Sequence, residues 1–200
     1  VHGGNSKKQR GILQPGNEVH ASWRARLEEH LGAFKVELVD GHAARVLSDP
    51  GRLAAMSSAC ALVDLCLPER EPHPKLFTLL QALVSTLPKA EWAAAYVAWE
   101  LSLLAELGFG LDLTTCTATG VIDDLIYVSP KSGRAVSRDA GERYRDKLLP
   151  LPQFLIGGGD TQGSAISEGL RLTAYFLERH VLGPHDKLLP DNRKRIARTV

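Results

Sequence analysis

Residues 103–138 read LLAELGFGLDLTTCTATGVIDDLIYVSPKSGRAVSR. The leading leucines have helical spacing, and Gly108 is a typical helix-ending residue. A short β pattern follows, in which Cys116 stands where a metal-binding knuckle would begin, but the second ligand position holds Thr119. Residues 135–140, where the later ligand pair would fall, contain neither Cys nor His. Because structural zinc needs four nitrogen or sulfur donors, we expect a zinc-ribbon-like hairpin that lacks zinc ligands and is carried by a helical domain.

The composition is that of an ordinary globular protein. The 200 residues are 44% hydrophobic and 24% charged, which is enough apolar material for the core of one large or two small domains. No apolar run reaches the roughly 20 residues that cross a bilayer, and the first residues have no signal-peptide pattern. The three cysteines and seven histidines have neither disulfide-framework nor metal-ligand spacing. We therefore expect a reducing, cytoplasmic environment and neither metal nor cofactor.

Positive charge is concentrated at both ends of the chain. Residues 1–26 carry five lysines and arginines against one glutamate, a net charge of +4. Residues 183–200 have a net charge of +3, and the segment between these two ends has a net charge of −6. Clustered positive charge attracts a polyanion. Two solvated termini would give the same pattern, so charge alone leaves both interpretations open.

The first forty residues have the pattern of a β-sheet. Residues 14–17, QPGN, fit a type II turn, in which Pro presets φ and Gly supplies a positive φ. Apolar and polar residues then alternate from 18 to 28, which predicts a strand with one buried face and places Trp23 in the sheet core. Residues 34–38 repeat the alternation. Two or three strands cannot enclose a core, so we expect further strands or a helical neighbour.

The rest of the chain is predicted to be mostly helical. Asp49 is a good N-cap before Pro50, and Pro68 marks the end of the helix that follows. The segment 92–107 is apolar around most of its circumference, as a central buried helix is. Its aromatic side chains are therefore expected to pack in the core rather than to stack on bases. We expect helices over residues 50–67, 74–86 and 88–107, a helix capped by Asp160 that extends to Leu182, and one more basic helix after Pro190.

No catalytic constellation emerges from the remaining motifs. The three glycines at 157–159 could cradle a phosphate at a helix N-terminus, but no Lys follows them as in a Walker loop, and a flexible connector fits better. Ser164 lacks the nucleophile-elbow pattern. The pair Asp123-Asp124 has no partner that would indicate acid–base chemistry. We therefore predict that the protein is not an enzyme.

The best candidates for a nucleic-acid site lie near the amino end. Lys7, Lys8 and Arg10 fall in what we expect to be a Gly/Ser loop, and Arg24 and Arg26 share the outward face of the adjacent strand. A basic loop beside two arginines on one face would form a short positive groove. Such a groove neutralises phosphates without reading the base sequence.

Several segments, taken in their order along the chain, resemble the RecO family of bacterial recombination mediators. The resemblance covers essentially all 200 residues. No one of the segments is specific by itself, but their order is. The segments are the basic stretch followed by LQPGN at 13–17, ELSLLAELGFG at 100–110, Cys116 with Gly120, VSPKSG at 128–133, and KLLPDNR at 187–193.

The resemblance implies an α+β fold with an oligonucleotide-binding (OB) type β-barrel followed by an α-helical domain. The partial barrel would occupy residues 1–40 and the helical domain residues 41–200, with the zinc-ribbon-like hairpin at about 114–138. By this resemblance the chain begins inside the barrel, so we expect an N-terminally truncated barrel with exposed strand edges.

The resemblance also implies a role in DNA repair and in homologous recombination by the RecF pathway, without enzymatic turnover. Family members bind and anneal single- and double-stranded DNA in the bacterial cytoplasm, at the nucleoid. They bind the acidic, apolar C-terminal tail of single-stranded DNA-binding protein, and with RecR they help to load RecA. By position, the DNA contacts would fall on Lys7, Lys8, Arg10, Arg24 and Arg26, and the tail-binding groove would lie near Arg171 and Arg179.

Two alternatives remain open. The chain could be a protein-interaction module that binds the acidic tail and has no DNA affinity of its own. A hydrolase is the third class, but it would need an acid–base pair or a nucleophile that the sequence does not offer.

Overall fold

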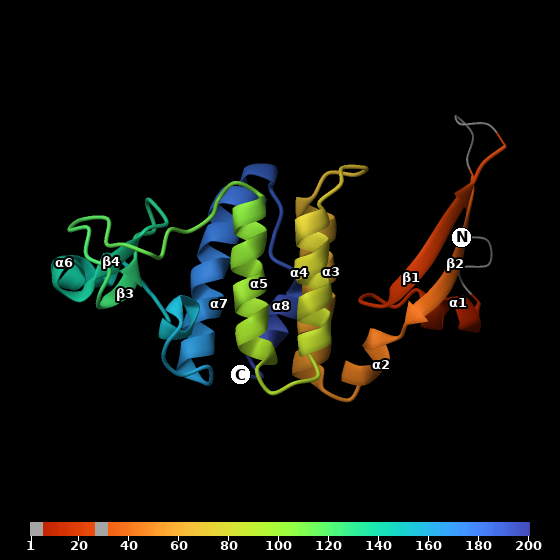
Figure 1. Ribbon diagram of the computed structural model, residues 1–200, viewed down its shortest axis with the longest axis horizontal. Helices are drawn as coiled ribbons and strands as arrows, with labels where there is room; N and C mark the ends of the chain where they lie inside the picture. The colour runs from red at the N-terminus through yellow and green to blue at the C-terminus, as the bar shows by residue number, and fades with distance from the viewer. Residues whose placement is uncertain (1–5, 27–31) are drawn as a thin grey trace.

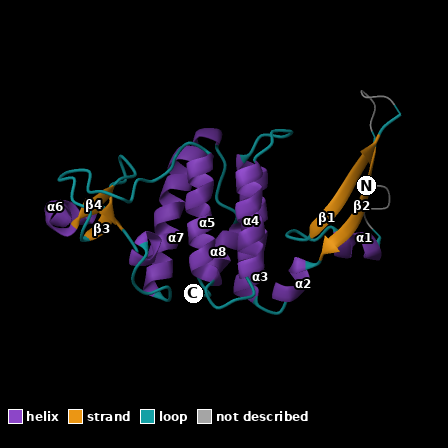
Figure 2. Ribbon diagram, viewed as in Figure 1, coloured by secondary structure: helices purple, strands orange, loops and turns teal. Residues whose placement is uncertain are grey.

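Three parts follow one another along the long axis of the molecule (Figure 1). A two-stranded ribbon with a short helix lies at one end, a bundle of helices lies in the middle, and a small three-stranded sheet lies at the other end (Figure 2). The computed structural model describes residues 6–26 and 32–200. None of the helices in these ranges combines the length and the apolarity that a bilayer crossing requires.

A short helix, α1 (Lys7–Ile12), precedes the ribbon where a basic loop was predicted. The prediction of a loop is wrong because Ser6 is an N-cap, whose side chain accepts a hydrogen bond from the backbone N–H of Gln9 at 3.2 Å. The type II turn that follows is confirmed. The N–H of Asn17 donates to the carbonyl of Gln14 at 3.1 Å, and Gly16 has a φ of +90°.

The ribbon consists of β1 (Glu18–Arg24) paired antiparallel with β2 (Ala33–Asp40). The predicted alternation is confirmed, because Trp23 lies opposite Phe34 and Ala21 opposite Val36 on one apolar face. That face is not buried as expected: Trp23 is 49% exposed and Phe34 46%, and only Val36 is buried. A two-stranded ribbon supplies no second layer over Trp23, and the described residues form no closed barrel. The strand predicted for residues 18–28 is described only to Arg24, and its last two predicted residues, 27 and 28, lie outside the described residues.

The bundle in the middle contains the main hydrophobic core. The predicted cap of its first long helix is confirmed, since a side-chain oxygen of Asp49 accepts from the N–H groups of Gly51 and Arg52 at 3.0 and 3.1 Å. Tyr96 and Leu103 are fully buried at the centre, and Met56 and Leu177 pack in the same cluster. The helices are α2 (His42–Val46), α3 (Pro50–Cys66), α4 (Pro74–Thr86), α5 (Trp92–Glu106), α7 (Ser164–Phe176) and α8 (Asp191–Ile196).

Two helix starts differ from the predictions. The helix expected from residue 88 begins at Trp92, after a turn in which the N–H of Lys89 donates to the carbonyl of Thr86 at 2.8 Å. Asp160 does not cap α7; its carboxylate accepts from the N–H of Gln162 at 3.1 Å in a separate turn, and α7 begins at Ser164. At its other end α7 continues as a π-helix, η3 (Leu177–Leu182), and a short 3-10 turn, η4 (Gly183–His185), follows.

The small sheet carries the predicted hairpin. Its strands are ordered β4-β3-β5, with β3 (Leu125–Val128) antiparallel to both β4 (Ala135–Ser137) and β5 (Leu149–Pro150). The segment that leads into the hairpin is fixed by backbone bonds, one of which joins the N–H of Cys116 to the carbonyl of Val121 at 2.7 Å. The short helices α6 (Arg138–Gly141), η1 (Glu142–Lys147) and η2 (Gln153–Ile156) complete this part of the molecule.

Candidate nucleic-acid interface

The predicted cations are on the part of the molecule that projects from the bundle. Lys7 and Arg10 are exposed on α1, which packs beside β2. Arg24 is exposed at the end of β1, and Arg26 is exposed two residues later. The side chain of Lys8 lies outside the described residues.

The polar face of the ribbon adds a cation that the predictions did not include. Cross-strand pairing places Lys35 opposite Ser22, on the face opposite to Trp23. Lys35 forms an ion pair with Glu37 at 2.7 Å, and both side chains are mostly exposed. The hydrogen bond and the charge of Lys35 lower the pKa of Glu37. Because Glu37 offsets the charge of Lys35, the net positive character of this face depends mainly on Arg24.

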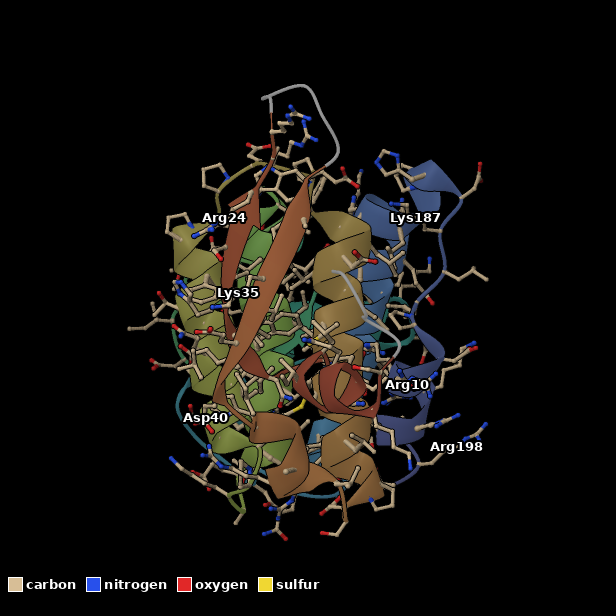
Figure 3. The ribbon with its side chains drawn as sticks, turned by 90° about the vertical axis from the view of Figure 1, so that its right-hand side faces the viewer. Arg10, Arg24, Lys35, Asp40, Lys187 and Arg198 are labelled. Carbon is tan, nitrogen blue, oxygen red and sulfur yellow. The ribbon has the colours of Figure 1, made fainter. Side chains whose placement is uncertain are left out.

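Arg10 and Arg24 do not lie next to each other. Figure 3 shows Arg24 and Lys35 along one side of the end view, whereas Arg10 lies on α1 toward the other side. The structure therefore brings Arg24 and Lys35 to one face of the ribbon and places Arg10 apart from them. A strand of nucleic acid that met both would have to cross the ribbon.

Hydrogen bonds at the base of the ribbon connect it to the helical bundle. The Asn17 amide nitrogen donates to the carbonyls of Gly11 and Ile12 at 3.0 and 3.2 Å, and its oxygen accepts from the N–H of Ala43 at 3.0 Å. One side chain thus joins α1, the start of β1 and α2. We expect the direction in which α1 and the ribbon project to depend on Asn17.

A second set of charges lies at the same base. Arg45 forms a two-contact ion pair with Asp40, at 2.8 and 3.0 Å, and its other guanidinium nitrogen lies 3.1 Å from the His42 ring. The other ring nitrogen of His42 lies 3.9 Å from Glu18 and 3.7 Å from Asp40. Two carboxylates lie beside the guanidinium of Arg45 and the ring of His42, so this base is a joint rather than a cationic surface.

The bundle contains a buried ion pair that sequence reasoning missed. Arg193 of α8 donates to the two carboxylate oxygens of Glu100 at 2.6 and 2.9 Å, and also to the carbonyl of Leu170 at 2.6 Å and the hydroxyl of Thr173 at 2.9 Å. Both charged side chains are buried. Burial lowers the pKa of Arg193, but the adjacent Glu100 raises it, and the net shift is upward. The signal available in the sequence was Glu100, a charged residue in the interior of a mostly apolar helix.

The hairpin holds its single cysteine in a polar setting. The Cys116 sulfur accepts from the backbone N–H of Ser137 at 3.3 Å and from its hydroxyl at 3.4 Å. Burial raises the pKa of the Cys116 thiol, but hydrogen bonds from Ser137 and Thr119 outweigh it and bring the pKa to about 6. Among the described residues, no group of three or more His, Cys, Asp or Glu side chains is arranged to hold a metal ion.

A groove of about 350 Å³ lies where the π-helix η3 meets the ends of α3 and α5. Phe109 and His180 stack there with ring centroids 5.4 Å apart, and the Lys187 ammonium donates to the carbonyl of Leu65 at 2.7 Å. Neither Arg171 nor Arg179 lines this groove; Arg171 is exposed on α7, and Arg179 lies over the Tyr175 ring at 5.9 Å. The groove is lined by Leu65, Cys66, Leu67, Pro68, Leu107, Phe109, His180, Val181, His185 and Lys187.

These features define a class of protein: a helical bundle with a small sheet at one end and a cation-bearing ribbon at the other. The family model described as "Recombination protein O C terminal" matches residues 47–189. The chain is 53% identical over 199 residues to a protein from Rhodospirillum centenum named "DNA repair protein RecO", an alignment that covers 98% of this chain and 80% of that protein. It is 48% identical to the protein of the same name from Rhodospirillum rubrum, over 98% and 81% of the two chains.

A third relative, from Jannaschia, also bears the name DNA repair protein RecO and is 47% identical over 98% of this chain and 80% of its own length. The chain belongs to the RecO family. The predicted resemblance is thereby confirmed, and so is the role in DNA repair and recombination that it implied. The names of the family and of these relatives describe repair and recombination and no catalytic activity.

Proposed function

We propose that this chain acts in repair and recombination as a non-enzymatic mediator that binds the phosphate backbone of DNA and holds strands for annealing. The observation that carries this proposal is a set of exposed arginines on an element that projects from the bundle. Arg10 and Arg24 are exposed, and neither forms an ion pair with another described residue. Unpaired, exposed guanidinium groups can neutralise phosphates without first breaking an internal contact.

The proposal includes the OB-type character of the ribbon and the zinc-ribbon-like character of the hairpin. The rings of Trp23 and Phe34 contact each other, with centroids 4.7 Å apart, and each side chain is about half exposed. Such an exposed apolar patch favours the interpretation that the ribbon is part of a larger sheet. We accordingly propose residues 1–40 as part of an OB-type domain and residues 41–200 as the helical domain, with the hairpin at about 114–138 inserted in it. The site of action would be the bacterial cytoplasm, at the nucleoid.

Salt dependence of binding tests the DNA proposal. The probe is a labelled single strand of mixed sequence, and binding is followed by fluorescence anisotropy over a range of salt concentrations. Each lost phosphate contact should reduce the slope of log affinity against log salt by about 0.7 for a single strand. The variants Lys7→Ala/Arg10→Ala and Arg24→Ala/Arg26→Ala should each reduce the slope by about 1.4.

A matched control removes two positive charges elsewhere. Arg143 and Arg145 are exposed on η1, at the opposite end of the molecule from the ribbon. Arg143→Ala/Arg145→Ala changes the net charge as the test variants do and should leave the slope unchanged. Equal effects of all three double variants would mean that only net charge matters and would contradict a ribbon site.

The second candidate function is recruitment of protein partners, namely RecR and the acidic tail of single-stranded DNA-binding protein. The groove beside η3 favours it, because an apolar floor with His180, His185 and Lys187 around it suits an apolar side chain next to a carboxylate. Arg171 and Arg179, the residues predicted for the tail, remain candidates for its more distant acidic residues.

Binding of a synthetic acidic, apolar peptide distinguishes a site in the groove beside η3 from a site at Arg171 and Arg179. Phe109→Ala should weaken binding of the peptide by at least tenfold if the groove holds its apolar end. Arg171→Ala and Arg179→Ala should have smaller, salt-dependent effects. Peptide binding by a chain that has no affinity for DNA would identify it as a pure interaction module.

A further inference from the structure

The C-terminal helix α8 has two chemically different faces. Arg193, Ile196 and the partly buried Val200 face the bundle, where α8 packs on α3. Lys194, Arg195 and Arg198 are all exposed. At 100° per residue these three cations fall within one arc, opposite to the buried residues. The turn after α8 continues this arrangement, since the N–H of Arg198 donates to the carbonyl of Arg195 at 3.1 Å.

The buried ion pair fixes α8 in this orientation. Arg193 binds Glu100 of α5 and the carbonyl of Leu170 of α7, so one residue joins α8 to two central helices. A six-residue helix has little stability of its own. The cations on its outer face are therefore held in place by the core rather than by the helix itself.

Two of the three exposed cations have no internal partner. Lys194 forms an ion pair with Asp191 at 2.9 Å, which lowers the pKa of that carboxyl. Arg195 and Arg198 form no ion pair with any residue in the described ranges. Their charges are thus available to an external anion, as those of Arg10 and Arg24 are.

The outer face of α8 is turned to the same side of the molecule as Arg10. Figure 3 shows Arg10, Lys187 and Arg198 on one side of the end view, and Arg24, Lys35 and Asp40 on the other. In Figure 1 α1 lies at one end of the molecule and α8 within the bundle. Cations on this side are therefore spread along the length of the molecule.

We infer that Arg195 and Arg198 form a second phosphate-binding surface, on the helical bundle, for the same nucleic-acid strand that Arg10 contacts on α1. This inference rests on the proposed function, because it requires that the chain binds nucleic acid. The path runs along one side of the molecule, from α1 to α8. A strand must be long enough to reach from α1 to α8 before it gains the second set of contacts.

The test uses the whole chain and labelled oligothymidylate strands of two lengths, about 10 and about 40 nucleotides. At 0.15 M salt Arg195→Ala/Arg198→Ala should weaken binding of the long strand about tenfold and reduce the salt slope by about 1.4. The loss should shrink as salt approaches 1 M, because the missing contacts are electrostatic. The short strand has fewer phosphates with which to contact both α1 and α8, so the variant should weaken its binding less than that of the long strand.

Three outcomes would distinguish the proposed DNA binding by the chain from the proposed surface on α8. If the wild-type chain binds neither strand, the proposed function fails. If the wild type binds and Lys7→Ala/Arg10→Ala weakens it while Arg195→Ala/Arg198→Ala does not, the α8 surface is refuted and DNA binding stands. If the α8 variant weakens short and long strands equally, the two surfaces do not share one strand and the inference is wrong.

Arg143→Ala/Arg145→Ala again serves as the matched control, and it should reproduce wild-type binding of both strands. A thermal melt of each variant accompanies the titrations. Arg195 and Arg198 are exposed, so their substitution should leave the melting temperature unchanged. A loss of binding that persisted at high salt would indicate structural damage and would count against the inference.

Discussion

The same residue types have opposite environments in the bundle and in the ribbon. Trp99 is 3% exposed in α5, whereas Trp23 is 49% exposed in β1. Arg193 is buried against Glu100, whereas Arg24 is exposed and has no ion-pair partner among the described residues. In the bundle several helices surround each side chain, and in the ribbon only one layer exists. Identical side chains thus stabilise the fold in one region and remain available for binding in the other.

The largest effect is expected from breaking the buried ion pair. Glu100→Ala leaves the Arg193 guanidinium buried without its carboxylate, which should lower the free energy of unfolding by about 3–5 kcal/mol. Urea denaturation followed by circular dichroism measures this loss. Exchange of both partners, Glu100→Leu with Arg193→Met, should recover most of the stability. A single variant that lost less than about 1 kcal/mol would show that the pair does not anchor α8.

The two tryptophans give the most direct test of the contrast in packing. Trp99→Ala should lower the free energy of unfolding by about 3–5 kcal/mol, because it opens a cavity in the core. Trp23→Ala should cost less than about 1 kcal/mol, because half of that side chain is already in water. The same urea denaturation applies to both. Equal losses would mean that the ribbon is packed as tightly as the bundle and would remove the distinction.

Removal of a helix cap should also cost more stability in the bundle than in α1, but the difference should be smaller than for the two tryptophans. Asp49→Ala removes the acceptor for two backbone N–H groups at the start of the 17-residue α3 and should cost about 1 kcal/mol. Ser6→Ala removes the cap of α1, which is short and exposed, so global unfolding should barely change. Thermal melts of the two variants measure both. A larger effect of Ser6→Ala would place α1 in the cooperative core.

A pH dependence of the stability is also expected from Cys116. Its pKa in the folded protein is about 6, below the usual pKa of a cysteine thiol of about 8.5. A lowered pKa means that the thiolate stabilises the fold fully above about pH 8.5, and that this contribution is lost as the pH falls through 6. The melting-temperature difference between wild type and Cys116→Ala should therefore shrink from pH 8.5 to pH 6. A difference independent of pH would show that the thiol stays neutral.

Much of the fold could be predicted because its signals are local. Asp49 with Pro50 and Pro74 fixed the starts of α3 and α4, and both helices begin at the predicted residues. The alternation of apolar and polar residues correctly predicted which side chains share a face of the ribbon. These features depend on residues a few positions apart, which a sequence displays directly.

The errors arose where distant contacts decide the outcome. Arg193 looked like one more tail cation, and its burial depends on Glu100, 93 residues away. Trp23 looked like a core residue because alternation reports which face a side chain takes and says nothing of whether a second layer covers that face. For the candidate site, the sequence supplied Arg10 and Arg24 but not their separation, which depends on how α1 folds beside the ribbon.

The central claim is that exposed arginines bind nucleic acid by neutralising phosphates, without reading bases. The most direct measurement compares the salt slopes of the wild-type chain for two single strands of equal length and different base composition. We predict equal slopes, steeper than −2, and a reduction of about 1.4 in both when Arg24 and Arg26 are replaced by alanine. Slopes near zero, or slopes that the replacements leave unchanged, would contradict the account.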